Sequence, residues 1–171
     1  MSQLNFLNNQ NKDDSCKKDE YNYWKLFIDG ASRNNPGPAG AGVYLLRNDE
    51  VFLREGFFIG KKTNNQAEYM ALLLGVFYLK KHMCKDDIAM IISDSQLLVR
   101  QMLREYKVKN SDLRPLYQLS NQLLSGINYN IAHVLRHENK EADKMANVGI
   151  DKGKRLPLDF KDVLHEYGMQ I

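Results

Sequence analysis

Cysteine is scarce in this chain, which has Cys16 and Cys84 among its 171 residues and no others. Two cysteines do not provide the disulfide framework on which many small secreted domains rely, and they lack the paired spacing of a zinc site. We therefore expect a reducing compartment, with the cytoplasm as the default location.

Long apolar runs are missing as well. No stretch approaches the roughly 20 apolar residues that cross a bilayer. Residues 1–20, MSQLNFLNNQNKDDSCKKDE, lack the basic and apolar regions of a secretory signal. We expect no membrane partner. Because these twenty residues are rich in Asn, Asp and Lys and have little to bury, we interpret them as a disordered polar leader.

A strong excess of one charge is also absent, since the formal net charge is +3. Residues 21–150 carry 17 basic and 13 acidic residues. If several of those acids gather in one site, the remaining surface is more basic, which suits a polyanionic partner. With 43% hydrophobic and 26% charged residues, the composition is that of one ordinary globular domain.

What the chain does contain is a regular succession of β-type and α-type patterns. Strands rich in β-branched and aromatic residues are expected at YNYWKLFID (21–29), twice within 39–60 around the turn RNDE (47–50), at IAMIIS (88–93) and at INYNIAHVL (127–135). Helices are expected at TNNQAEYMALLLGVFYLKKH (63–82), SQLLVRQML (95–103), SDLRPLYQLSNQLL (111–124) and ENKEADKMANVG (138–149).

This order, three strands followed by alternating helices and strands, predicts an α/β fold with a mixed sheet and helices packed on it. We assign the domain to residues 21–150 and expect its last helix to end at Gly149. Residues 151–171 are too few for a second domain, and we expect them to pack as a tail or to fray.

Four acids fall at distinctive places in this sketch. Asp29 ends the first strand, Glu68 lies in the first turn of the first helix, Asp94 ends the fourth strand and Asp143 lies on the last helix. Two strand ends at one sheet edge and two flanking helices can converge on a single crevice, where α/β sheets usually bind ligands.

Each acid also has an ordinary explanation. Asp29 could form a turn, Glu68 could favour the helix N-terminus, Asp94 could cap the helix after it, and Asp143 could pair with a neighbouring lysine. Together these explanations leave unexplained why two buried strands both end in aspartate. Four converging carboxylates repel one another unless a divalent cation neutralises them. A site of oxygen ligands favours Mg²⁺ or Mn²⁺ over Zn²⁺.

Several motifs together make the chain similar to a known family. FIDGAS with NPGPAGAG, TNNQAEYMAL, SDSQLLVRQM and HENKEADKMAN resemble the type 1 ribonuclease H family in order and spacing, over about 26–149. The resemblance implies a ribonuclease H-like fold, a five-stranded mixed sheet flanked by helices. It also implies an endonuclease that hydrolyses the RNA strand of RNA–DNA hybrids and leaves 5′-phosphate ends. Asp29, Glu68, Asp94 and Asp143 match the family's catalytic acids, which bind two metal ions, Mg²⁺ or alternatively Mn²⁺.

The resemblance also implies contacts to the hybrid. Asn35, Asn65 and Gln96 match positions that contact the minor groove, Asn64 is a further candidate, and Thr63 matches a contact to a DNA-strand phosphate. Short amides can sense a 2′-OH on one strand and its absence on the other. Helix capping and a turn are the ordinary explanations for the three asparagines. Basic side chains that could contact phosphates, or simply lie in solvent, are Lys61, Lys62, Arg104, Lys107 and Lys109.

The chain departs from the family pattern in two places. Many members carry a basic, Trp-containing protrusion between the second and third helices, but here residues 104–117 pass almost directly from one to the other. The loop before the last acid, HVLRHENKEAD (133–143), is shorter than in many members, so either His137 or Arg136 could assist catalysis by aiding product release. For His133 we expect a structural role in the last strand.

Three other functions are open at this stage. One is a non-catalytic nucleic-acid-binding module, which would have no need of four acids that repel phosphate. Another is a DNA-processing nuclease of the same superfamily, and the third is a cation-binding protein without nucleic-acid function. The intact TNNQAEYMAL motif and Asn35 favour an enzyme that acts on hybrids. We also expect this enzyme to be a monomer.

Overall fold

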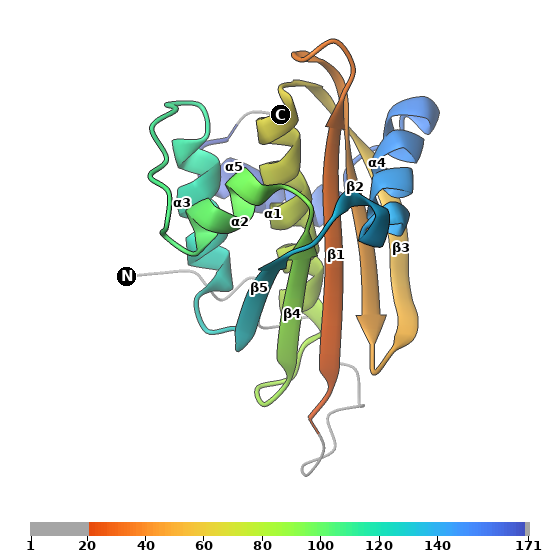
Figure 1. Ribbon diagram of the computed structural model, residues 1–171, viewed down its shortest axis with the longest axis vertical. Helices are drawn as coiled ribbons and strands as arrows, with labels where there is room; N and C mark the ends of the chain where they lie inside the picture. The colour runs from red at the N-terminus through yellow and green to blue at the C-terminus, as the bar shows by residue number, and fades with distance from the viewer. Residues whose placement is uncertain (1–20, 170–171) are drawn as a thin grey trace.

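The computed structural model describes residues 21–169 as a five-stranded sheet flanked by helices (Figure 1). The strands are β1 (Tyr23–Ser32), β2 (Gly37–Arg47), β3 (Glu50–Lys62), β4 (Ile88–Ser93) and β5 (Tyr129–His133). The helices are α1 (Asn64–His82), α2 (Gln96–Met102), α3 (Arg114–Leu124), α4 (Lys140–Lys152) and α5 (Leu158–Glu166), with a short 3₁₀ turn, η1 (Arg136–Glu138).

Two expectations concern the ends of the chain and its cysteines. The predicted disordered leader, residues 1–20, lies outside the described residues, and so does Cys16. Cys84 is described and lies between α1 and β4. No helix within 21–169 is long and apolar enough to cross a membrane.

The sheet has the mixed topology that the sequence predicts. Its strand order is β3-β2-β1-β4-β5; β1, β2 and β3 pair antiparallel, whereas β4 is parallel to both β1 and β5. Asn48 and Asp49 form the turn between β2 and β3, with φ values of 52° and 66°. Left-handed backbone at both central residues is typical of a two-residue hairpin turn, and Asn and Asp adopt it more readily than most residues.

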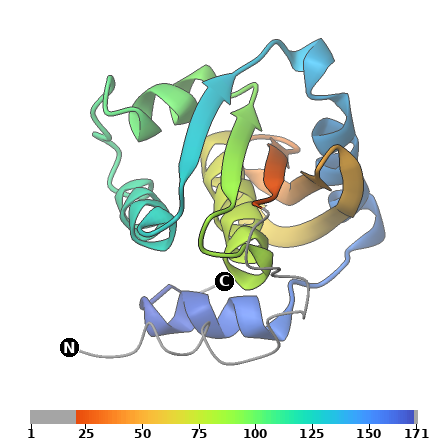
Figure 2. The same cartoon turned by 90° about the horizontal axis from the view of Figure 1, so that it is seen from below.

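Helices cover the sheet on both faces (Figure 2). α1 packs on the face formed by Leu26 and Ile28 of β1, and α3 covers α1 from outside. Because α1 lies between two layers, its residues from Tyr69 to Phe77 are all buried. α4 packs on the opposite face, against β2 and β3.

Gly149 does not end the last predicted helix, contrary to our expectation. It lies inside α4, which continues to Lys152 and ends at Gly153 in the left-handed conformation, with φ of 60°. A Cβ at Gly149 would lie 2.6 Å from the backbone nitrogen of Phe57, so glycine is needed for the close approach of α4 to β3. Gly149, which the sequence predicts to be a helix end, is therefore explained by the close packing of α4 on β3.

The C-terminal segment belongs to the same packed unit as the rest. Residue 150 lies within α4, and α5 follows it and docks beneath α1. Phe160 of α5 is fully buried, with its ring centroid 5.4 Å from that of Phe77 in α1. α5 therefore completes the core on the α1 side of the sheet.

Candidate active site

The sequence predicted that Asp29 ends the first strand, but Asp29 lies inside β1, which continues to Ser32. β1 pairs with β4 as far as Ile28 and Ser93, whereas its pairing with β2 continues to Ser32. The strand continues past Asp29 because β1 still pairs with β2 there. On its other side, β1 has no pairing with β4 beyond Ile28, so this edge of the strand is open. The Asp29 side chain is 6% exposed. A nearly buried carboxylate thus lies where the crevice of the sheet begins.

Glu68 reaches the same point from α1. A Cβ at Gly30 would lie 2.1 Å from the backbone carbon of Ala67, so glycine at this position allows α1 to approach β1 closely. The Gly30 N–H donates a hydrogen bond of 3.1 Å to Glu68 Oε2. Glu68 is the fifth residue of α1, beyond the first turn where we expected it. The favourable interaction of an acid with the helix dipole decreases within the first turn, so it does not explain why Glu68 is at this position.

Asp94 directly follows β4, as predicted. It does not cap α2, because the N-cap is Ser95, whose Oγ accepts a hydrogen bond of 3.4 Å from the Leu98 N–H. Asp94 Oδ1 instead accepts a hydrogen bond of 2.8 Å from Asn139 Nδ2. The side chain is therefore turned away from the helix that it could have capped and toward the start of α4.

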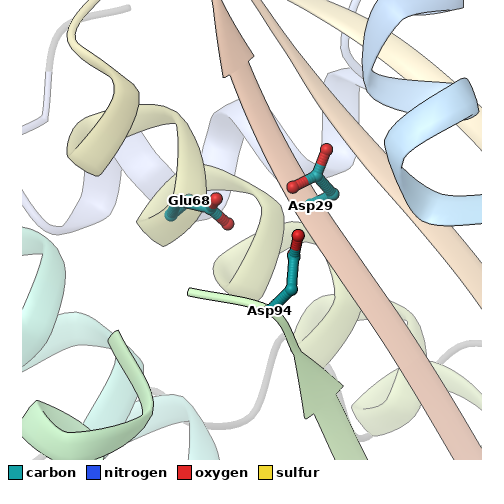
Figure 3. A group of neighbouring side chains, drawn as sticks. All are labelled: Asp29, Glu68 and Asp94. Carbon is teal, nitrogen blue, oxygen red and sulfur yellow. The ribbon is translucent and has the colours of Figure 1, made fainter. Parts of the chain in front are cut away.

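The carboxylates of Asp29, Glu68 and Asp94 form one cluster, in which one oxygen from each lies within 4.8 Å of the others (Figure 3). Burial, together with the charges of Asp94 and Asp143, raises the pKa of Asp29 to about 7. Burial and the charges of Asp29 and Asp94 also raise the pKa of Glu68 well above its ordinary value. The arrangement is costly for three anions, and a bound cation would remove that cost.

Asp143 lines the same cleft from the first turn of α4. Its partner is not a neighbouring lysine of the helix but Arg136, whose Nη2 lies 2.7 Å from Asp143 Oδ1. This bond raises the pKa of the Arg136 guanidinium, and the same positive charge offsets part of the rise in the pKa of Asp29. Arg136 thus places a positive charge beside the acidic cluster.

The two candidates from the shortened loop are placed differently. Arg136 and His137 both belong to η1 and are exposed, but the cleft lining includes Arg136 and not His137. His133 is the last residue of β5 and is exposed. The cleft has a volume of about 410 Å³. It is lined by Asp29, Gly30, Ala31, Ser32, Arg33, Asn64, Glu68, Asp94, Arg136, Asp143 and Asn147.

Amide side chains on the rim of the cleft are fixed by hydrogen bonds to backbone. Asn35 Oδ1 accepts a hydrogen bond of 2.9 Å from the Asn64 N–H, and Asn64 Oδ1 accepts one of 3.0 Å from the Ser32 N–H. This network ties the loop after β1 to the start of α1. It uses the oxygen of each amide, and no hydrogen bond among residues 21–169 engages either NH₂ group.

Thr63 caps α1, as the sequence predicted. Its side chain accepts from the Gln66 N–H at 3.2 Å, and Gln66 Oε1 accepts from the Thr63 N–H at 2.9 Å, which completes a capping box. Beside this cap is a second hollow of about 280 Å³. It is lined by Asn35, Thr63, Asn65, Gln66, Asn110, Asp112 and Leu113.

The remaining predicted contacts are not among the residues that line these two hollows. Gln96 is the exposed first residue of α2, and Lys61 and Lys62 are at the end of β3. The basic side chains of 103–113, between α2 and α3, are exposed at Arg104, Lys107 and Lys109. They remain candidates for phosphate contacts.

Sequence reasoning missed four residues of the site region, namely Arg33, Asn110, Asn139 and Asn147. Arg33 and Asn147 line the cleft, and Asn110 lines the second hollow. Asn139 is 1% exposed and contacts Asp94. Asn139 and Asn147 could have been flagged by their spacing of four residues on either side of Asp143, which places all three on one face of a helix.

Comparisons with known proteins agree with this geometry. Residues 27–149 match the family described as "Reverse transcriptase-like". The chain is 39% identical over 127 residues to ribonuclease HI of Halobacterium salinarum, covering 73% of this chain. The crystal structure of RNase H1 from that archaeon has a TM-score of 0.72 and 35% identity, covering 76% of this chain and 98% of that one.

A second similar structure contains a bound nucleic acid. LC11-RNase H1, isolated from compost, is 33% identical, with a TM-score of 0.71, and the match covers 75% of this chain and 97% of that one. Its structure is of a complex with an RNA/DNA hybrid.

The curated relatives are longer than the region that matches. The match spans 63% of the Halobacterium protein and 35% of the bifunctional protein Rv2228c of Mycobacterium tuberculosis, which is 39% identical over 129 residues covering 74% of this chain. The family is nevertheless clear from the extent of the family match and from the near-complete coverage of the solved domains. The chain belongs to the type 1 ribonuclease H family.

Proposed function

We propose that this chain is a metal-dependent endoribonuclease that hydrolyses the RNA strand of RNA–DNA hybrids and leaves 5′-phosphate ends. The observation that carries the proposal is the cluster of Asp29, Glu68 and Asp94, whose carboxylate oxygens lie within 4.8 Å of one another at the open edge of β1. Asp143 lines the same cleft. A purely structural role would not require several acids to be gathered against their own repulsion.

The donor set fits hard divalent cations. It consists of carboxylate oxygens, with no cysteine or histidine among the three clustered ligands, which favours Mg²⁺ or Mn²⁺ over Zn²⁺. Asp29, Glu68, Asp94 and Asp143 would hold two such ions. When bound, two ions activate a water as nucleophile and stabilise the leaving oxygen of an in-line phosphoryl displacement.

The protein's own groups position the cluster before any ligand arrives. β2 holds Asp29 rigid where β4 has ended, and the Gly30 N–H orients Glu68. Arg136 holds Asp143 and is the positive side chain beside the acids. We assign to Arg136 the task of holding a phosphate near the cleft, because a guanidinium can bind two phosphate oxygens at once.

The amide-lined rim supplies selectivity for the hybrid. Asn35 and Asn64 are fixed by their oxygens, so their NH₂ groups can donate to acceptors in a minor groove. Asn65 and Gln96 extend this set on α1 and α2, and Thr63 faces the second hollow, where a DNA-strand phosphate could lie. Readout of 2′-hydroxyls and groove shape is how proteins distinguish RNA-containing duplexes.

Family membership and the hybrid-bound neighbour support the choice of substrate. A DNA-processing nuclease or a non-catalytic binding module on the same fold would share the sheet. The first would cleave DNA and the second would cleave nothing, so a cleavage assay distinguishes both from the proposed function. We further expect the chain to act as a monomer, which light scattering would check.

The decisive experiment offers three labelled duplexes, an RNA–DNA hybrid, double-stranded RNA and double-stranded DNA, each with Mg²⁺, Mn²⁺ or a chelator. The expected result is cleavage of the hybrid's RNA strand alone, with either metal and not with chelator, and 5′-phosphate product ends. Binding without cleavage in every metal would favour the binding module. Cleavage of DNA would favour the DNA-processing alternative.

A further inference from the structure

Asn139 stands out among the polar residues because it is buried, with 1% of its surface exposed, yet lies at the junction of three elements. Its Nδ2 donates two hydrogen bonds, one of 2.9 Å to the Ile28 backbone oxygen in β1 and one of 2.8 Å to Asp94 Oδ1 beyond β4. Its Oδ1 is buried without a hydrogen-bond partner among the described residues.

The position of Asn139 in the chain makes this use of the amide unusual. Asn139 is the N-cap residue of α4, where an asparagine oxygen commonly accepts a backbone N–H of the first turn. No such bond is formed here. The start of α4 therefore lacks a stabilising side-chain cap, and the buried Oδ1 of Asn139 has no partner among the described residues. Both amide hydrogens are used instead in the bonds to the Ile28 oxygen and to Asp94. A residue selected for helix stability alone would not be arranged in this way.

Through these bonds one side chain and its backbone are connected to three of the four acids. Ile28 is the residue before Asp29, so the bond to its carbonyl fixes the strand at that acid. Asp94 is contacted directly. The Asp143 N–H donates a hydrogen bond of 3.1 Å to the Asn139 backbone oxygen, which fixes the first turn of α4.

We propose that Asn139 is a positioning residue that orders the acidic cluster for divalent cations, which deepens the proposed function and rests on it. The neutral NH₂ group suits this task. It restricts the rotation of the Asp94 carboxylate without adding a positive charge that would compete with a cation, as a lysine or arginine in the same place would. Groups that hydrogen-bond to metal-binding carboxylates commonly tune the affinity of a site in this way.

The chain offers a matched control at the other end of the sheet. Asn22 Nδ2 donates a hydrogen bond of 3.0 Å to Asp87 Oδ1, and Asp87 is 1% exposed. The chemistry is the same, an amide that donates to a carboxylate, but Asn22 precedes β1 and lies beside the start of β4, far from the acidic cluster along both strands. Asn22→Ala should affect folding stability without affecting the metal site.

The test measures Mn²⁺ binding by electron paramagnetic resonance, without substrate, for wild type, Asn139→Leu, Asn139→Ala and Asn22→Ala. Leucine keeps the branched shape of the asparagine side chain and removes its donors, and alanine provides a second, smaller variant if the leucine variant does not fold. Thermal unfolding in chelator shows which variants are folded, and binding is compared at a temperature where all of them are.

We expect both Asn139 variants to bind Mn²⁺ at least about 10-fold more weakly than wild type, the usual scale for loss of such a group. Asn22→Ala should bind as wild type does. With hybrid as substrate, the Asn139 variants should lose kcat at a fixed metal concentration while KM for the hybrid stays within about twofold, since the groove contacts are untouched.

Unchanged Mn²⁺ affinity in folded Asn139 variants would overturn the proposal, and so would equal losses in Asn139 and Asn22 variants, or a wild type that binds no Mn²⁺. The proposed function fails separately, if wild type binds Mn²⁺ and leaves the hybrid intact. The two failures are therefore distinguishable.

Discussion

Ile28 and Ser93 form the last residue pair between β1 and β4, and the next residue after each of them is an aspartate. Parallel strands present their carboxyl ends at the same sheet edge, so Asp29 and Asp94 emerge side by side where pairing stops. Glu68 joins them because α1 approaches β1 across Gly30. The cluster is thus a consequence of where two strands separate and how closely one helix packs.

The first prediction concerns Asp29→Asn. The change preserves the shape of the side chain but removes a charge from the cluster, so cleavage of the hybrid should fall by about 100-fold or more while affinity for the hybrid is largely kept. Single-turnover assays and fluorescence anisotropy would measure the two effects. Asp159→Asn on α5, which removes an ion pair with Lys81 of α1, is the control and should cleave as wild type does. Near-normal turnover in Asp29→Asn would refute the metal-site proposal.

The second prediction concerns stability and pH without metal. Burial and neighbouring charges raise the pKa of Asp29 to about 7 from its ordinary value of 3.8. Between these values the folded protein holds a proton that the unfolded chain has released, so stability falls as pH rises through this window and the loss is complete above about pH 7.

Asp29→Asn has no proton to lose at this position. In chelator its Tm should match that of wild type near pH 4 and exceed it by roughly 3–10 °C at pH 8. Added Mn²⁺ should narrow this difference by raising the Tm of wild type. Calorimetry at several pH values would measure the Tm difference between wild type and variant. Asp86→Asn, which changes an exposed carboxylate, is the control, and its Tm difference from wild type should not grow with pH. A constant difference across the pH range would contradict the electrostatic account.

The sequence could predict the sheet and the acids because both depend on local patterns. The continuous apolar run 88–93 predicts a buried strand, and an acid directly after it predicts a carboxylate at the sheet edge. The strand order follows from a three-strand meander and the later crossovers. For Asp94 and Asp143 these rules suffice to place the acids in the right elements.

Other features depend on contacts distant in sequence and were beyond these rules. β1 continues past Asp29 because of its pairing with β2, which local propensity does not reveal. A glycine such as Gly149 often marks a helix end, but here it allows α4 to pack closely against the backbone of Phe57. The partner of Asp143 is Arg136 and not a neighbouring lysine, because η1 places the Arg136 guanidinium in the cleft beside the first turn of α4. The contact of Asn139 with Asp94 could not be predicted, because an asparagine before a helix is usually explained as an N-cap.

The third prediction separates Arg136 from His137. Arg136 lines the cleft and holds Asp143, whereas His137 is exposed and is not part of the lining. Arg136→Ala should raise KM and lower kcat, so that kcat/KM falls by about 10-fold or more, because both a phosphate contact and the orientation of an acid are lost. His137→Ala should stay within about twofold of wild type. Steady-state kinetics would check both, and the reverse order would assign the role to His137.

The fourth prediction concerns salt. If Lys61 and Lys62 at the end of β3 contact phosphates, hybrid affinity should fall steeply as salt rises, and changing both to alanine should lessen the slope of log K against log salt by about 1–2. The exposed pair Lys107 and Lys109, between α2 and α3, is tested in the same way and shows whether this loop takes the place of the missing protrusion. An unchanged slope would mean that the pair concerned lies only in solvent.

The last prediction concerns Asn64, which joins two parts of the rim. Its Oδ1 accepts from the Ser32 N–H and its own N–H donates to Asn35 Oδ1, so its NH₂ group is held in place at the mouth of the cleft. Asn64→Ala removes the donor and loosens the loop after β1. Asn64→Asp keeps the acceptor for Ser32 but has no NH₂ group to offer the minor groove.

Both variants should therefore raise KM for the hybrid by about 5–10-fold with a smaller effect on kcat, because a substrate contact is lost while the acids stay in place. Their Mn²⁺ affinity should equal that of wild type, which separates them from the Asn139 variants. Gln118→Ala, an exposed amide on α3, serves as the control. If Asn64→Asp cleaves the hybrid with the KM of wild type, the amide hydrogens are not used, and Asn64 serves only to brace the loop through Ser32.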